Sequence, residues 1–275
     1  MSLFQSSVLK KHLATQDQDS IASAYEKYTA YFLNPQIQEN IRGSNEEQFQ
    51  EGFLRELFVK ILGYTINPNP DFNLTTELKN IKDAKKTDGA VLKDGKALAV
   101  IELKGTDTKD LDKVTDQAFN YKNNQPDCVY VVTSNFEKLR FYIHNAVQHE
   151  EFRLFTLSLD QFKLLWLFLQ KDNLLRGLPE KIKGESLLRE EQVTKRLYKD
   201  YSAFKNDLWH DMCQNNSEAD ELELYKKSQK LLDRFLFIFF AEDKGLLPPN
   251  SISKIVDDFK KLKELDAYKP LYSLF

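Results

Sequence analysis

Cysteine, glycine and proline are all scarce in this 275-residue sequence. The two cysteines, Cys128 and Cys213, stand far apart and form no CxxC pair, so the chain offers neither a disulfide framework nor the ligand spacing of a zinc ribbon. Only 9 glycines and 8 prolines occur, which is too few for a loop-rich all-β sandwich or a low-complexity linker protein. These scarcities favour a fold dominated by helices, in a reducing compartment.

The sequence also lacks a long hydrophobic run. The longest strongly apolar run, Phe235 to Ala241, is bracketed by charged residues and is far shorter than the ~20 residues needed to cross a bilayer. The N-terminus has no apolar signal region with a small-residue cleavage site. We therefore expect a cytoplasmic protein that makes no membrane contact.

An excess of positive charge is missing as well, because 39 lysines and arginines stand against 42 aspartates and glutamates, for a net charge of -3. Binding to nucleic acid through bulk charge is therefore excluded, and any DNA contact must be local. One candidate is the lysine cluster formed by Lys79, Lys82, Lys85 and Lys86. A charge run of this kind is equally consistent with a loop that faces water.

Core-forming aromatic residues are abundant, with 20 Phe and 12 Tyr. Apolar residues recur every three or four positions from Asn45 to Leu62, which predicts an amphipathic helix that ends at Gly63. From Thr87 to His144 β-forming residues dominate, interrupted by a helical stretch at Thr108–Asn123, and after about Leu159 only helical patterns follow. We predict an α/β (α+β) domain with a small mixed sheet flanked by helices, followed by an all-α domain.

A boundary between these two parts is indicated by Gly177, Pro179 and Gly184, which punctuate the sequence within a short stretch. We place the N-terminal helices and the sheet domain in residues 1–175, and a helical domain in residues 176–275.

The strand pattern that runs from Ala97 to Lys104 ends in two charged side chains, Glu102 and Lys104. The pleat of a strand puts both on one face, with Leu103 on the other. An ion pair at a frayed strand end would explain these two residues, whereas burying either charge alone would cost on the order of several kcal/mol. A second carboxylate, Asp88 on the preceding strand pattern, makes a functional site the better interpretation if it shares the face of Glu102.

The hairpin register decides whether Asp88 and Glu102 share a face. A two-residue loop at Asp94 and Gly95 would pair Asp88 with Ile101 and leave the carboxylates on opposite faces. A three-residue loop, Lys93–Gly95, with Gly95 in the left-handed conformation, instead pairs Asp88 with Val100 and brings both carboxylates to one face. We therefore predict the three-residue loop.

Two carboxylates that converge at a strand end form a hard-oxygen site. Such a site suits Mg²⁺, with Mn²⁺ as a substitute, because these cations prefer oxygen ligands and keep several waters. A lysine beside the cation can orient a water and stabilise developing phosphoryl charge. The pattern therefore predicts metal-dependent hydrolysis of phosphodiester bonds.

Asp88, thirteen further residues and then Glu102-Leu103-Lys104 resemble the PD-(D/E)XK nuclease motif, with Thr87 in place of the proline that precedes the aspartate in the family. The resemblance implies a restriction-endonuclease-like core. It also implies that Asp88, Glu102 and the backbone carbonyl of Leu103 hold the metal, and that Lys104 positions the attacking water.

Two further features resemble parts of this family. Gln117 and Tyr121 lie one helical turn apart in the pattern after the ExK strand and resemble the QxxxY motif of RecB-like members, which implies that they brace the lysine or a DNA phosphate. The family also has an acidic residue on the helix before the motif. We assign this role to Glu51, acting through a water or a second cation, with Glu47 as the alternative.

A broader resemblance runs along most of the chain. The segments that carry it are Gln38–Arg42, Glu47–Arg55, Leu62–Tyr64, Asn73–Glu77 and Leu236–Pro248. They are similar to the N-terminal part of type IIG restriction-modification enzymes, which fuse a nuclease, a helical connector and an adenine-specific DNA methyltransferase. No Gly-rich cofactor loop and no Asn-Pro-Pro-Tyr motif appears, so the chain resembles an N-terminal fragment, and S-adenosylmethionine would bind only in the absent methyltransferase.

The resemblance implies a site-specific deoxyribonuclease that acts on double-stranded DNA in phage defence. A transient dimer would allow both strands to be cut. One alternative is a nuclease fold that no longer cuts and serves as a structural arm of a methyltransferase or phage-defence complex. Another is a structure-specific resolvase or repair nuclease, which the long helical tail disfavours.

Overall fold

The computed structural model describes residues 3–79 and 86–264. The chain divides into two compact units, Met1–Glu191 and Gln192–Phe275. Within the predicted lysine cluster, Lys82 and Lys85 lie outside the described residues, and Lys86 forms an ion pair with Glu77. No helix in the described ranges is long and apolar enough to span a membrane.

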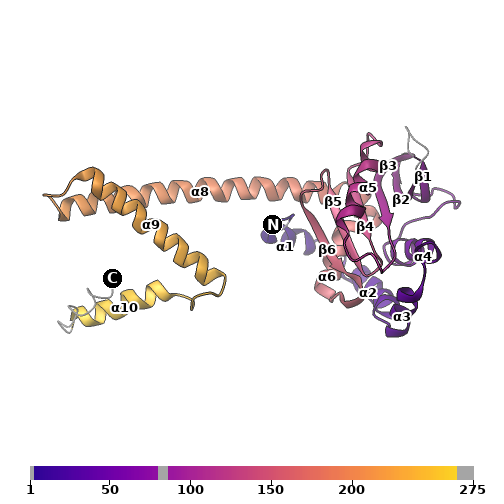
Figure 1. The fold of residues 1–275 in the computed structure, drawn as a ribbon, viewed down its shortest axis with the longest axis horizontal. Coiled ribbons are helices and arrows are strands. Elements are labelled where there is room, and N and C mark those ends of the chain that lie inside the picture. Colours follow the sequence, from indigo (N-terminus) through magenta and orange to yellow (C-terminus); the bar gives the residue numbers. More distant parts are fainter. Residues whose placement is uncertain (1–2, 80–85, 265–275) are drawn as a thin grey trace. The chain divides into compact units, whose positions relative to one another are not determined.

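The first unit contains a layer of short helices and one sheet (Figure 1). The helices before the sheet are α1 (Ser6–Leu13), α2 (Gln18–Phe32), α3 (Pro35–Gly43), α4 (Glu46–Phe53) and the π-helix η1 (Leu54–Ile61). Those after it are the 3-10 helix η2 (Leu154–Thr156), α6 (Leu159–Leu169) and α7 (Lys171–Leu175). The predicted helix at 45–62 is confirmed, with Asn45 as its N-cap in a capping box and Gly63 at φ 84° after its end.

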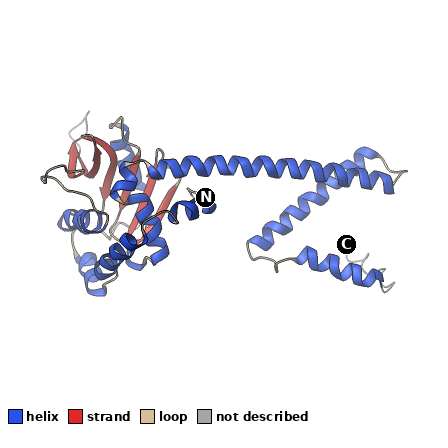
Figure 2. Cartoon of the chain, turned by 180° about the vertical axis from the view of Figure 1, so that it is seen from behind, coloured by secondary structure: helices blue, strands red, loops and turns tan. Residues whose placement is uncertain are grey.

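Six strands form the sheet in the order β1 to β6, drawn as red arrows in Figure 2. They are β1 (Leu74–Lys79), β2 (Lys86–Lys93), β3 (Lys96–Leu103), β4 (Tyr130–Ser134), β5 (Lys138–Ile143) and β6 (His149–Arg153). Neighbours are antiparallel except β3 and β4, which are parallel and joined through α5 (Asp112–Asn123). The predicted mixed sheet flanked by helices is confirmed. The hydrophobic pattern does not reveal β1 and β6, because these edge strands carry mostly polar residues.

Both faces of the sheet are buried. Ala99, Ile101 and Leu103 of β3 face the large core that the N-terminal helices and α6 share. Val100 faces the other side, where it packs with Val131 and with Ala118 of α5. Glu102 alternates with Ile101 and Leu103, so its side chain lies on the α5 face of a sheet that is covered on both sides.

The hairpin between β2 and β3 corrects the predicted loop. Lys93 pairs with Lys96, so the turn has two residues, Asp94 at φ 51° and Gly95 at φ 75°, as a type I′ turn requires. The register then shifts by one residue between Val91 and Leu92, because a bulge in β3 leaves Leu98 without a partner in the ladder. The predicted three-residue loop is therefore wrong. The bulge compensates for the shorter turn, so Asp88 and Glu102 still share a face.

The division between the two units lies within α8 (Leu178–Asn215), at residues 191 and 192 rather than at the predicted 175 and 176. The helix begins directly after Gly177, at φ 73°, close to the predicted boundary. Its first turns pack on the first unit, because Ile182 and Ser186 are buried and Ser186 Oγ accepts the Gln5 N–H at 3.1 Å. The break in the sequence pattern therefore marks the start of the helix rather than the end of the first unit.

The second unit is helical, as predicted. It contains the remainder of α8 together with α9 (Glu221–Asp243) and α10 (Ser251–Glu264). Tyr201 Oη donates a hydrogen bond to Asp233 Oδ1 at 3.3 Å, and Trp209 Nε1 donates to the Glu221 carbonyl at 3.1 Å, so α8 and α9 contact each other along the helical hairpin.

Candidate active site

The two predicted metal-binding carboxylates face each other across neighbouring strands. Gly89 pairs with Ile101, and the next residues in this register are Asp88 and Glu102. Asp88 Oδ2 accepts the backbone N–H of Leu103 at 2.7 Å, which fixes the aspartate against the end of β3. The Glu102 side chain is only 2% exposed. The bulge thus places the half-buried Asp88 and the buried Glu102 together on one face of the sheet.

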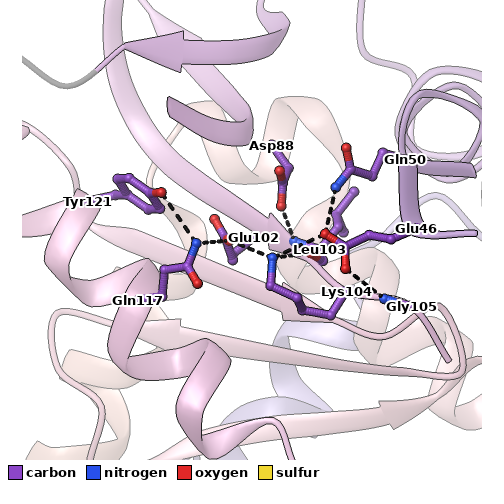
Figure 3. A network of polar contacts seen from close by, with 9 residues as sticks. All are labelled: Glu46, Gln50, Asp88, Glu102, Leu103, Lys104, Gly105, Gln117 and Tyr121. Carbon is purple, nitrogen blue, oxygen red and sulfur yellow. Dashed lines mark hydrogen bonds and ion pairs between the residues drawn. The ribbon is translucent and has the colours of Figure 1, made fainter. Parts of the chain in front are cut away.

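Lys104 is held by three oxygen atoms. Its ammonium donates to Glu102 Oε1 at 3.0 Å, to the Leu103 carbonyl at 2.9 Å and to Glu46 Oε1 at 3.2 Å (Figure 3). An ammonium has three N–H donors, so all of them are used. Two of the three groups predicted to hold the metal, the Glu102 carboxylate and the Leu103 carbonyl, therefore accept hydrogen bonds from Lys104 in this structure.

The predicted QxxxY pair reaches the site from α5. Gln117 Nε2 donates to Glu102 Oε1 at 2.5 Å and to Tyr121 Oη at 3.3 Å. Figure 3 shows both side chains on the opposite side of Glu102 from Glu46. The direct partner of Gln117 in the structure is thus Glu102, and that of Tyr121 is Gln117. That the pair braces the lysine or a DNA phosphate stays a prediction.

The acidic side chain of this helix that reaches the site is that of Glu46, not that of Glu51 or Glu47. Glu46 Oε2 accepts the N–H of Gly105 at 3.3 Å in addition to the contact with Lys104. Glu51 instead forms an ion pair with Arg55 at 2.7 Å and is 61% exposed, and Glu47 is exposed too. The structure therefore brings Glu46, in place of the predicted Glu51, to the other predicted site residues.

Helical periodicity explains this correction. Phe49 and Phe53 are the buried residues of α4, and Glu46 lies three residues before Phe49 and seven before Phe53. It therefore lies on the stripe that faces the sheet, whereas Glu51 falls between the two phenylalanines on the solvent side. Gln50, which the sequence analysis missed, shares the inner face and donates to Glu46 Oε1 at 3.2 Å. Comparing the helical position of each acidic residue with the buried positions of Phe49 and Phe53 would have selected Glu46 as the acid that faces the site.

Burial dominates the electrostatics of the site. It raises the pKa of the Glu102 carboxyl to about 7, with a further contribution from the charge of Asp88 that Lys104 only partly offsets. Burial also raises the pKa of Asp88, although the hydrogen bond from the Leu103 N–H and the charge of Lys104 both act to lower it. Burial disfavours the charge on Lys104, but attraction to Glu102, Asp88 and Glu46 outweighs it and raises the pKa of the ammonium. Lys104 is therefore charged at neutral pH.

The raised pKa predicts how stability depends on pH without metal. The folded state binds the Glu102 proton more tightly than the unfolded state, so protonation of Glu102 stabilises the fold. This contribution is complete below about pH 4.5 and is lost as pH rises through about 7. We expect the unfolding free energy in a chelator to fall by on the order of 3 kcal/mol across this window, as the pKa difference implies. Denaturant titrations of wild type and Glu102→Gln measure it, and the variant should lack most of the slope. Parallel pH curves for the two proteins would contradict the assignment.

The donor set fits a hydrated hard cation. Among the described residues no group of three or more His, Cys, Asp and Glu side chains is arranged to enclose a metal ion. The site instead offers two carboxylates and a backbone carbonyl, which would leave other positions to water, as Mg²⁺ prefers. Glu102 Oε2 is buried and has no hydrogen-bond partner in the part of the chain that is described. A cation would supply the partner that this oxygen lacks.

Comparisons of the chain with protein-family models, with curated proteins and with solved structures found no match. The functional assignment therefore depends on the geometry of the site and on the motifs in the sequence.

Proposed function

We propose that this chain carries a magnesium-dependent DNA endonuclease site. Asp88, Glu102 and the backbone carbonyl of Leu103 would hold the cation. When bound, Mg²⁺ would polarise a phosphodiester group and lower the pKa of a water molecule, which is the chemistry that phosphodiester hydrolysis requires. The product expected from the family resemblance is a 5′-phosphate.

The protein side chains have distinct roles in this proposal. Lys104 is charged and has only donors, so it would orient the attacking water and stabilise negative charge on the phosphate rather than remove a proton. Gln117 and Tyr121 would hold Glu102 in its orientation through the Gln117 amide. Glu46 would hold Lys104 at the end of β3 through its 3.2 Å contact.

The observation that carries the proposal is the buried Glu102 oxygen next to a second carboxylate. Placing Asp88 and Glu102 together below the protein surface raises the pKa of both groups, which costs folding free energy. Glu102 Oε2 also lacks a hydrogen-bond partner among the described residues. An arrangement that is unfavourable for stability and sits at a strand end is typical of a functional site.

The wider resemblance supports a restriction-modification enzyme of the type IIG kind, with double-stranded DNA as the substrate. S-adenosylmethionine would then belong to a methyltransferase outside this chain, and a transient dimer would cut both strands. A second candidate is the silent structural arm. It is favoured by one observation, because all three N–H donors of Lys104 already have protein acceptors, as in a purely structural ion pair.

Plasmid nicking distinguishes these two functions. With excess Mn²⁺ or Mg²⁺ we expect slow nicking of supercoiled plasmid, at low salt because a chain of net charge -3 binds DNA weakly. The nicks should carry ligatable 5′-phosphates and should be absent when the metal is chelated. A chain that binds Mn²⁺ but produces no more nicks than its heat-inactivated form would favour the structural arm.

A further inference from the structure

A row of polar side chains crosses the sheet from the proposed site. Glu102 of β3 pairs with Thr133 of β4, Thr133 pairs with Arg140 of β5, and Arg140 pairs with Glu151 of β6. Residues paired in register point to the same face, so this row continues Asp88 and Glu102 across the α5 side of the sheet. Thr133 thus stands directly beside the Glu102 carboxylate.

Thr133 is a buried polar residue whose hydroxyl is unsatisfied among the described residues. It is 0% exposed, and its Oγ1 has no hydrogen-bond partner in the described part of the chain. The neighbouring Glu102 Oε2 is buried and unpartnered in the same way. Two such atoms on directly paired residues are exceptional, because a buried hydroxyl or carboxylate oxygen without a partner costs about 1–3 kcal/mol.

Two other buried threonines, Thr115 and Thr87, show what a structural hydroxyl does in this fold. Thr115 Oγ1 lies 2.9 Å from the Leu111 carbonyl and 2.8 Å from Tyr142 Oη, and Thr87 Oγ1 donates to the Gly89 carbonyl at 2.9 Å. Both therefore satisfy local groups. Thr133 is also buried, but its hydroxyl has no such partner among the described residues, and Glu102, with which it pairs in the ladder, carries an unsatisfied oxygen too.

We propose that Thr133 is a positioning residue of the metal site, an inference that rests on the proposed function. Its hydroxyl would donate a hydrogen bond to Glu102 Oε2 on the paired strand when the carboxylate turns to hold the cation. This hydrogen bond would fix Glu102 in its ligating orientation from the β4 side, opposite to the hold that Gln117 provides from α5. Partners of this kind, which do not touch the metal, orient the ligands that do.

The test compares two nearly isosteric substitutions at buried threonines, Thr133→Val and Thr115→Val. We expect Thr133→Val to weaken Mn²⁺ binding about 10- to 100-fold in calorimetry, the usual effect of losing such a partner. In a chelator its melting temperature should stay the same or rise, because the substitution removes an unsatisfied buried hydroxyl. Thr115→Val should show the opposite pattern, with a lower melting temperature and unchanged Mn²⁺ affinity. Thr133→Ser, which keeps the hydroxyl, should retain most of the affinity.

Each outcome bears on the inference. Equal Mn²⁺ affinity of wild type and Thr133→Val would overturn the role of Thr133 and leave the proposed metal site intact. A fall in melting temperature as large as that of Thr115→Val, without a loss of affinity, would identify a structural hydroxyl instead. Wild type that binds no Mn²⁺ would overturn the proposed function, and this inference with it.

Discussion

Replacing Asp88 with asparagine should abolish Mn²⁺ binding at the site, and so should Glu102→Gln. Either change leaves a single carboxylate, and a cation held by one carboxylate keeps most of its hydration shell and gains little from the protein. We expect each variant to lose at least about 100-fold in affinity, because losing a direct ligand should cost as much as or more than losing an outer partner. Isothermal titration calorimetry with Mn²⁺ measures this directly.

Glu51→Gln is the matched control for these variants. Glu51 belongs to the same acidic helix as Glu46, but its carboxylate pairs with Arg55 on the solvent side. Its substitution should therefore leave Mn²⁺ affinity unchanged. If Asp88→Asn and Glu102→Gln both bind as tightly as this control, the two carboxylates do not form a metal site.

Replacing Lys104 with methionine should separate metal binding from cleavage. The ammonium contacts Glu102 Oε1 and the Leu103 carbonyl, so it competes with a cation for that carbonyl and for the negative charge of the Glu102 carboxylate. Its removal should leave Mn²⁺ affinity equal to or higher than that of wild type. Cleavage should fall by about 100- to 1000-fold, the cost of losing a donor that stabilises charge in the transition state. Plasmid nicking at saturating Mn²⁺, with calorimetry on the same preparation, tests both parts.

Glu46→Gln provides the comparison for Lys104→Met, because it weakens the hold on the lysine without removing it. We expect cleavage by Glu46→Gln to lie between that of wild type and that of Lys104→Met. Nicking by Lys104→Met at the wild-type rate would show that the lysine has no part in the reaction.

Sequence periodicity predicted those parts of the fold that depend on local patterns. The apolar residues of β3 and the charged pair at its end are a local signal, and so is the capped helix that starts at Asn45. The strand pattern and the ExK motif therefore placed Glu102 and Lys104 correctly on one face. The edge strands β1 and β6 gave no such signal, because their polar residues resemble those of loops.

The register of the hairpin could not be derived from the turn alone. Asp94 and Gly95 fit a two-residue turn, and the bulge that restores the shared face of Asp88 and Glu102 lies several residues away, beside Val91 and Leu92. A bulge depends on packing at both faces of the sheet, which a single strand does not encode. The requirement that both carboxylates share a face was correct, while the loop chosen to satisfy it was wrong.

The location of the cation is the most direct test of the site. We expect crystals soaked in Mn²⁺ to show one anomalous scattering peak that contacts Asp88, Glu102 and the Leu103 carbonyl, at the ~2.1 Å expected for an Mg²⁺-type ion with oxygen ligands. The Lys104 ammonium should have left the Leu103 carbonyl to make room for it. Crystals that bind Mn²⁺ elsewhere, with Lys104 still hydrogen-bonded to Glu102 and Leu103, would contradict the proposed nuclease site.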